Sequence, residues 1–202
     1  MADFTHFDSR GNAIMVDISD KEITSRTAVA KGIISMNKDS MSAVLGGTAK
    51  KGDVLGVARI GGIMAAKRCA QLIPLCHPLN FDKCTINFLI NKNKNEIEAS
   101  CEVKLSGKTG AEMEALTGVS VALLTVYDMC KALDRAMVIG NIRVCEKTGG
   151  KTGSLTGGLT AALKQEDKDS EENIQNENTD DKTAALIQED LDSREYIQVN
   201  LD

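Results

Sequence analysis

The stretch "CTINFLINKNKNEIEASCEVKL" (84–105) decides the fold, because two alternating runs flank one polar turn. In the second run the apolar positions are 97, 99, 101, 103 and 105, and "NKNKNE" separates this run from the first. Alternation with a period of two is typical of a strand with one buried face. The stretch therefore predicts an antiparallel β-hairpin.

A predicted helix stands on each side of this hairpin. The first, in "KKGDVLGVARIGGIMAAKRCAQL" (50–72), begins after Asp53 as N-cap. Its expected buried face contains Val54, Val57, Gly61, Met64, Ala65 and Leu72, and its small residues would allow close packing. The second, "AEMEALTGVSVALLTVYDMCKAL" (111–133), is apolar for nearly three turns and should be buried on most sides.

Two further predicted strands stand at the beginning and the end of this series of helices and strands. "TSRTAVAKGII" (24–34) and "MVIGNIRVCEK" (137–147) are rich in β-branched residues, and a short helix "SMSAVLGG" (40–47) follows the first. The order is strand, helix, strand, strand, helix, strand. This order predicts an α+β, ferredoxin-like split βαβ sandwich, with both helices on one face of an antiparallel sheet.

The chain divides by composition into a body, 1–160, and an acidic tail, 161–202. Residues 163–202 hold 13 acidic and 4 basic side chains, which leaves residues 1–162 with a net charge of +4. We expect an N-terminal arm over 1–15, a glycine-rich end at 148–160, and a disordered tail with one short helix near "TAALIQEDL" (183–191).

The same numbers exclude several classes of protein. A charge of +4 over the body suits a bound polyphosphate but not a nucleic-acid surface, and six aromatic residues are too few for base stacking. No leader or membrane-crossing stretch is evident, and the six cysteines lack a C-x-x-C spacing. We therefore expect a cytoplasmic protein with reduced thiols and no membrane partner.

The segment "LIPLCHPL" (72–79) contains both prolines of the chain. Prolines stiffen their surroundings, so we expect an extended segment that holds His77 in one orientation at a site. The alternative is a surface loop whose histidine satisfies local hydrogen bonds. Cys76 and His77 would point to opposite faces of an extended segment, so we predict no metal site there.

Several charged residues remain open to two interpretations. Lys50 and Lys51 precede a helix N-terminus, where they are either solvated or ready for an anion. Gly107-Lys108-Thr109 and Gly150-Lys151-Thr152 lack the spacing of a P-loop, although Lys147 and Lys151 could touch phosphate.

The long predicted helix carries charges at both of its ends. Glu112 and Glu114 lie in the first turn, and Asp128 with Lys131 forms either a simple ion pair or part of a site. Glu114 and Asp128 would be about 21 Å apart at 1.5 Å per residue. If both ends serve one small ligand, they must come from different subunits of an oligomer.

Four stretches together resemble the cyclic pyranopterin monophosphate synthases of molybdenum-cofactor biosynthesis. They are "MVDIS" (15–19), "KGDVLGVARIGGIMAAKRCAQLIPLCHPL" (51–79), "GKTGAEMEALTGVSVALLTVYDMCKAL" (107–133) and "MVIGNIRVCEKTGGKTG" (137–153). The resemblance covers about residues 5–155 and implies a lyase that converts a cyclised dihydro-GTP to the pyranopterin with release of pyrophosphate. It also implies a ferredoxin-like hexamer, a trimer of dimers, with sites at subunit interfaces and no required cofactor. Mg²⁺ could accompany the triphosphate.

The resemblance also assigns residues. It implies Lys51, Lys131, Asp128, Arg26 and His77 as catalytic, with Asp128 orienting Lys131 and Lys51 acting as a base. It places Leu75, Cys76, His77, Glu112, Met113 and Glu114 against the substrate. Two alternatives stay open: a non-catalytic, nucleotide-binding oligomeric regulator, and a thiol sensor acting through Cys76.

Overall fold

The computed structural model describes residues 6–47, 52–150, 155–156 and 196–198. The long strands are β1 (Thr24–Ser35), β2 (Lys83–Asn91), β3 (Glu96–Gly107) and β4 (Val138–Thr148). Two short strands are β5 (Leu155–Thr156) and β6 (Tyr196–Gln198), and the helices are α1 (Lys38–Leu45), α2 (Val54–Lys67), α3 (Cys69–Leu72) and α4 (Glu112–Cys130).

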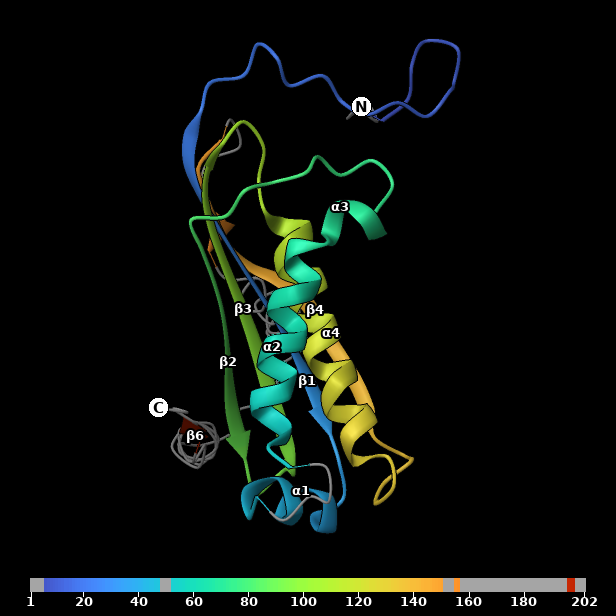
Figure 1. Cartoon of the computed structure of the whole chain (residues 1–202), viewed down its shortest axis with the longest axis vertical. Coiled ribbons are helices and arrows are strands. Elements are labelled where there is room, and N and C mark those ends of the chain that lie inside the picture. The colour runs from blue at the N-terminus through green and yellow to red at the C-terminus, as the bar shows by residue number, and fades with distance from the viewer. Residues whose placement is uncertain (1–5, 48–51, 151–154, 157–195, 199–202) are drawn as a thin grey trace, which may run out of the picture.

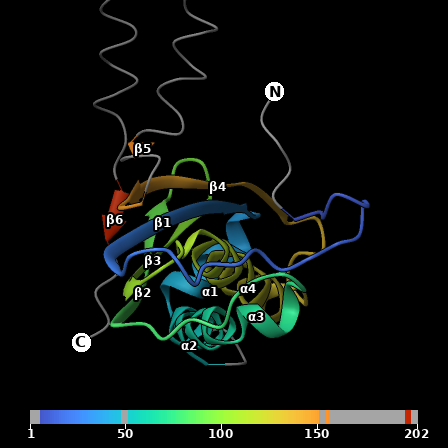
Figure 2. The same ribbon diagram turned by 90° about the horizontal axis from the view of Figure 1, so that it is seen from above.

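The four long strands lie in the order β4-β1-β3-β2, and each neighbouring pair is antiparallel. In the β2–β3 hairpin, Cys84 pairs with Val103 and Asn91 with Glu96. Both α2 and α4 cover one face of this sheet (Figures 1 and 2). The predicted ferredoxin-like α+β arrangement, including its hairpin, is confirmed.

The core lies between α4 and the covered face of the sheet. Alternate residues of β1 and β3 are buried from Ala28 and Ile97 onward, as the period of two requires. The two helices approach closely because glycines face each other: a Cβ on Gly62 would lie 2.8 Å from the Gly118 carbonyl oxygen. The expected close packing of the small residues is therefore confirmed.

The predicted core face of the first long helix is only partly right. Val57, Met64 and Leu72 are exposed, whereas the buried positions of α2 are Val54, Leu55, Ala58, Gly62, Ala65 and Ala66. Leu72 departs from the expected face because α2 ends at Lys67 and α3 begins anew at Cys69. Val57 and Met64 lie within α2 on the flank that does not face the core. Likewise Leu124 of α4 is exposed, so that helix is not buried on most sides.

Asp53 caps α2 as predicted, since its carboxylate accepts a hydrogen bond of 2.9 Å from the Gly56 amide. The short helix α1 ends at Gly46 as expected. Among the described residues, α4 alone is long and apolar enough to cross a membrane. It packs against β1, β3, β4 and α2, which identifies it as a core helix.

Both edges of the sheet receive short strands from beyond residue 150. β5 pairs with β4 at Glu146–Lys147, and β6 pairs with β2 at Leu89–Asn91. The sequence did not predict β6, which lies within the tail expected to be disordered. The expected helix at 183–191 lies outside the described residues, and the body–tail boundary stays a prediction.

Candidate active site

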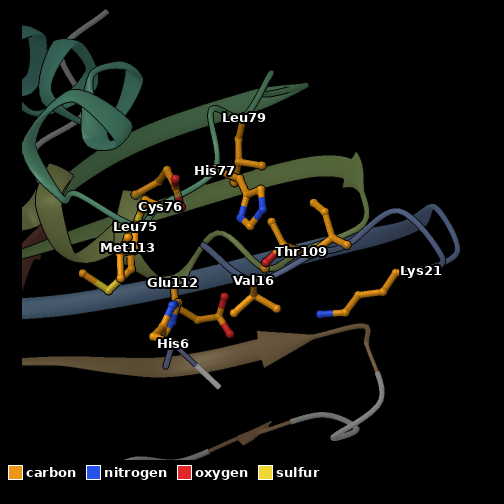
Figure 3. A pocket seen from close by; sticks show the side chains of 13 residues that line it. His6, Val16, Lys21, Leu75, Cys76, His77, Leu79, Thr109, Glu112 and Met113 are labelled. Atoms are coloured by element: carbon orange, nitrogen blue, oxygen red, sulfur yellow. The ribbon is translucent and has the colours of Figure 1, made fainter. Parts of the chain in front are cut away.

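Two adjoining pockets lie at the end of the fold where α4 begins. The first, of about 390 Å³, is lined by the N-terminal arm, the loop after α3 and the first turn of α4 (Figure 3). The second, of about 700 Å³, is lined by β1, the arm, the β3–α4 turn and the end of β4. They share Lys21, Thr109, Gly110 and Glu112 as lining residues, so one extended ligand can occupy both.

The loop after α3 supplies Leu75, Cys76 and His77 to the first pocket. The loop is not fully extended as predicted: the Cys76 amide donates a 3.1 Å hydrogen bond to the Ile73 carbonyl, which closes a turn with Pro74 at its second position. Cys76 and His77, which follow this turn, both line the first pocket.

A metal site receives no support from the described residues, among which no three histidine, cysteine or acidic side chains form a ligand group. The absence of a metal from the reaction stays a prediction. Cys69, Cys76, Cys84, Cys101 and Cys145 are free thiols, and Cys69, Cys101 and Cys130 are buried.

The first turn of α4 supplies Glu112, Met113 and Glu114. Glu112 forms an ion pair with Lys147, which joins α4 to the end of β4. Glu114 is only 3 % exposed, and this burial raises the pKa of its carboxyl above the ordinary value. The turn therefore presents two carboxylates in different environments: Glu112 is paired with a cation, and Glu114 is buried in the pocket wall.

Arg26 of β1 lines the second pocket together with Lys21, Lys108 and Lys147. The Arg26 Nε donates a 2.9 Å hydrogen bond to the Gly107 carbonyl, which fixes the guanidinium. Gly150, with a φ of +86°, passes so close that a Cβ would lie 2.7 Å from Arg26 Nη1. Four cations around one pocket, with Asp20, Glu22 and Glu112 as the acids, suit a phosphate chain.

The chain before β1, which we call the arm and take as residues 6–21, contributes residues that the sequence did not predict. His6, Val16, Ile18 and Lys21 line the first pocket, and the arm is held where Lys108 Nζ donates 2.6 Å to the Ser19 carbonyl. This part of the chain has no periodic pattern, and only the resemblance of "MVDIS" (15–19) singles it out. The Asp17 carboxyl accepts hydrogen bonds from Ser19, which lower its pKa, and Lys108 and His77 lower it further.

Asp128 and Lys131 lie at the opposite end of α4, away from both pockets. Lys131 Nζ is 2.6 Å from an Asp128 carboxylate oxygen, and the two side chains are 54 % and 59 % exposed. The predicted ion pair is thus present. Lys51 precedes α2 and lies outside the described residues, as does Lys151.

An exposed apolar surface runs along α2 and α4 between these two ends. We call it the α2–α4 surface, and its exposed apolar side chains are Val57, Ile60 and Met64. A shallow hollow of about 550 Å³ follows it, lined also by Gly61 and Thr125. Large apolar side chains grouped in this way are typical of a surface that another protein covers.

Comparison with known proteins gives a consistent result. Residues 15–150 match the MoaC family. The chain is 59 % identical over 148 residues to a cyclic pyranopterin monophosphate synthase of Clostridium botulinum, which covers 73 % of this chain and 93 % of the relative. Synthases of the same name from Heliobacterium modesticaldum and Desulforapulum autotrophicum are 54 % and 52 % identical, each over 75 % of this chain and 95 % and 93 % of the relative.

Proposed function

The chain belongs to the MoaC family, and from this premise we propose that it is a cyclic pyranopterin monophosphate synthase of molybdenum-cofactor biosynthesis. The observation that carries the proposal is an identity of 52–59 % that extends over 93 % or more of each relative's length. The proposed substrate is the cyclised dihydro-GTP, and the products are the pyranopterin with its cyclic phosphate and pyrophosphate.

The two pockets match the two parts of this substrate, because one is lined by several cations and the other contains the Glu114 carboxyl. The cationic pocket around Arg26 suits the triphosphate, whose charge its lysines would neutralise as pyrophosphate leaves. The first pocket suits the purine, whose N–H edge can donate to the Glu114 carboxylate. His77 stands in the wall of the first pocket, where it can handle either a proton or a phosphate oxygen.

We assign acid–base work to Lys51 and Lys131, with Asp128 orienting Lys131. The Asp128–Lys131 pair is largely exposed, so its contribution to stability is about 0–1 kcal/mol. This pair at the end of α4 adds little stability, so it is well suited to a functional role. Ring opening, ring closure and pyrophosphate displacement all move protons, which is the chemistry that such groups provide.

The proposed site requires more than one chain. Within one chain, α4 keeps Lys131 far from His77 and Arg26, since a helix of 19 residues is about 28 Å long. We therefore propose that Lys131 of one protomer completes the pockets of another, in a homohexamer built as a trimer of dimers. The exposed α2–α4 surface supports such an assembly.

The proposal also covers the cofactors of the protein and its cellular compartment. No cofactor is required, and Mg²⁺ could accompany the triphosphate. The free thiols support a cytoplasmic location, where cysteines stay reduced.

The competing function is a nucleotide-binding oligomeric regulator on the same fold. Incubation of the purified protein with the cyclised dihydro-GTP separates the two. The synthase releases pyrophosphate and gives a fluorescent pterin after oxidation, whereas the regulator binds the compound and releases neither. Alkylation of Cys76 in the same assay tests the thiol sensor, since full activity after alkylation excludes an essential thiol.

A further inference from the structure

The arm, residues 6–21, lies outside the long strands and the helices, yet it contributes to both pockets. Val16 and Ile18 line the first pocket, and Lys21 lines both. Figure 3 shows the Lys21 side chain reaching toward the other residues of the first pocket. A segment without regular structure needs a specific contact to hold its side chains at a pocket, because ordering it costs conformational entropy.

The last part of the arm, residues 17–21, forms a compact turn. The Ser19 amide and hydroxyl donate to an Asp17 carboxylate oxygen at 2.8 and 2.6 Å. The Lys21 amide donates to the Ile18 carbonyl at 3.1 Å, which closes a β-turn. All of these bonds join residues two or three positions apart. They therefore fix the shape of the turn but not its place on the protein.

Lys108 attaches this turn to the rest of the fold. It follows β3, in the connection that leads to α4, and its Nζ donates a 2.6 Å hydrogen bond to the Ser19 carbonyl, 89 positions away in the sequence. A charged donor makes a stronger hydrogen bond than a neutral one. Because the amide, hydroxyl and carbonyl of Ser19 all take part in hydrogen bonds, the bond from Lys108 holds the turn as one unit.

The attachment lies at the wall that the two pockets share. Lys108 is followed by Thr109 and Gly110, which line both pockets, and Lys108 itself lines the second. Lys21 is only two residues from Ser19, so the place of the Ser19 carbonyl limits where the Lys21 side chain begins. Lys108 can thus serve a ligand in two ways, either through the arm or by direct contact with an anion.

We propose that Lys108 is a positioning residue for the arm, whose hydrogen bond to the Ser19 carbonyl keeps Lys21 at the place where the two pockets adjoin. The proposal rests on the proposed synthase function for the identity of the ligand, a purine triphosphate. Lys21 then stands beside the phosphate chain, and Lys108 acts on that ligand through the arm. The competing role is direct contact between the Lys108 ammonium group and a phosphate.

Variants of Lys108 in the full-length protein test the proposal. Lys108→Met removes the donor, and Lys108→Arg keeps both the donor and the charge. The matched control is Lys83→Met, because Lys83 is a lysine of β2 that pairs with Glu102 and lines neither pocket. For Lys108→Met we expect KM to rise about 10-fold and kcat to change by less than about 3-fold, since one hydrogen bond from a charged donor at the surface is lost. Lys108→Arg and the control should keep KM within about 2-fold of the parent.

Hydrogen exchange of the ligand-free protein measures the attachment itself. In Lys108→Met, peptides that cover residues 17–21 should exchange about 10-fold faster than in the parent, because the turn opens locally once its anchor is lost. Lys108→Arg and Lys83→Met should show the exchange of the parent. Unchanged exchange in Lys108→Met, or Lys108→Arg as impaired as Lys108→Met, overturns the proposal. If Lys108→Met fails to fold, Lys108→Gln takes its place as a neutral and shorter side chain.

A double-mutant cycle separates the two roles of Lys108. If Lys108 acts through Lys21, the variant that carries both Lys21→Met and Lys108→Met should have a KM within about 3-fold of that of Lys21→Met alone. If Lys108 contacts a phosphate directly, the two effects should multiply, and a KM that is the full product of the two single changes overturns the proposal.

The exchange measurement also separates this proposal from the proposed function, because it needs no turnover. A protein without synthase activity that shows the expected exchange pattern refutes the synthase function and leaves Lys108 as the anchor of the arm. A protein with full synthase activity and the same exchange in every variant refutes the role of Lys108 and leaves the synthase function standing.

Discussion

The two ends of α4 differ in how much of a site one chain builds around them. At the N-terminal end, Glu112 and Glu114 meet the arm, the His77 loop and the cations of β1 and β4. At the C-terminal end, Asp128 and Lys131 face mostly solvent and line neither pocket. The difference indicates that folding of one chain organises the first end; in the proposed assembly, the second end joins a site through association.

The sharpest way to break this comparison is to disable the two ends in separate chains. Lys131→Ala and His77→Ala should each lose activity by about 10²–10⁴-fold, since each removes a proton-transfer group. After mixing and reassembly of the two variants, random pairing should restore about a quarter of the parent activity, because some interfaces then combine two intact ends. Pyrophosphate release measures this recovery.

Absence of any recovery, with mixed oligomers shown by mass spectrometry, would contradict a site shared between protomers. The control is a mixture of each variant with itself. Both variants should keep the parent melting temperature, because His77 is in a loop and the Lys131 pair is exposed.

A second prediction concerns the organised end alone. Glu114→Gln should raise KM about 10–100-fold, because an amide in place of a charged acceptor weakens the hydrogen bonds to a purine edge. Burial raises the pKa of Glu114 in the folded protein, so the folded state favours the protonated form. The free energy of unfolding therefore falls as the pH rises from the ordinary pKa of a glutamate through the raised pKa of Glu114. Below the ordinary pKa the carboxyl is protonated in both states and has no such effect.

Thermal unfolding at several pH values measures this effect. Glu114→Gln should melt at a higher temperature than the parent at pH 8, and this advantage should disappear near pH 4. Met113→Leu, at a neighbouring position without charge, should show no such pH dependence. An advantage of Glu114→Gln that is equal at both pH values would show that burial does not penalise the carboxylate.

A third prediction compares two aspartates near the C-terminal end of α4: Asp134, which stabilises the fold, and Asp128, which is proposed to serve activity. Asp134 is buried and accepts hydrogen bonds from the Asn37 amide at 2.7 Å and the Ala136 amide at 2.8 Å. Asp134→Ala should therefore destabilise the fold by about 1–3 kcal/mol per unsatisfied donor group. Asp128→Ala should leave stability within about 1 kcal/mol while it lowers activity. Urea unfolding and the pyrophosphate assay distinguish the two aspartates, and equal loss of stability in both would contradict the comparison.

The smallest expected effect belongs to the tail. The relatives match about three quarters of this chain over nearly their whole length, so their activity does not depend on a tail of this kind. Truncation after residue 160 should change kcat/KM by less than about 2-fold while it removes β6 from the outer edge of β2. Hydrogen exchange at Leu89–Asn91 should become faster, and unchanged exchange there would contradict the pairing with β6.

Local patterns were sufficient for most elements of the fold. Alternation in 84–105 predicted the hairpin, Asp53 marked the start of α2, and the apolar run of 111–133 predicted α4, because each signal depends on neighbours along the chain. The predicted buried face of α2 was partly wrong, because the buried side of a helix depends on contacts with other elements. Its periodic pattern continues past Lys67, and only packing against α4 shows which flank is buried.

The sequence was sufficient to predict which residue types form the candidate site, but not which distant segments of the chain come together there. The resemblance assigned Glu112, Glu114, Arg26 and His77, which one end of the fold brings together. His6 and Lys21, which line the pockets from the stretch before β1, carry no pattern that links them to distant partners. Their roles depend on contacts between segments far apart in the sequence.

The sequence by itself determined the order of strands and helices, the membership of the family and the chemical character of the site. These properties reside in residue types and their spacing. Only the tertiary structure decided that residues of the arm line the first pocket and that the Asp128–Lys131 pair lies apart from both pockets. The physical reason is that burial and hydrogen bonding between remote segments exist only once the chain is packed.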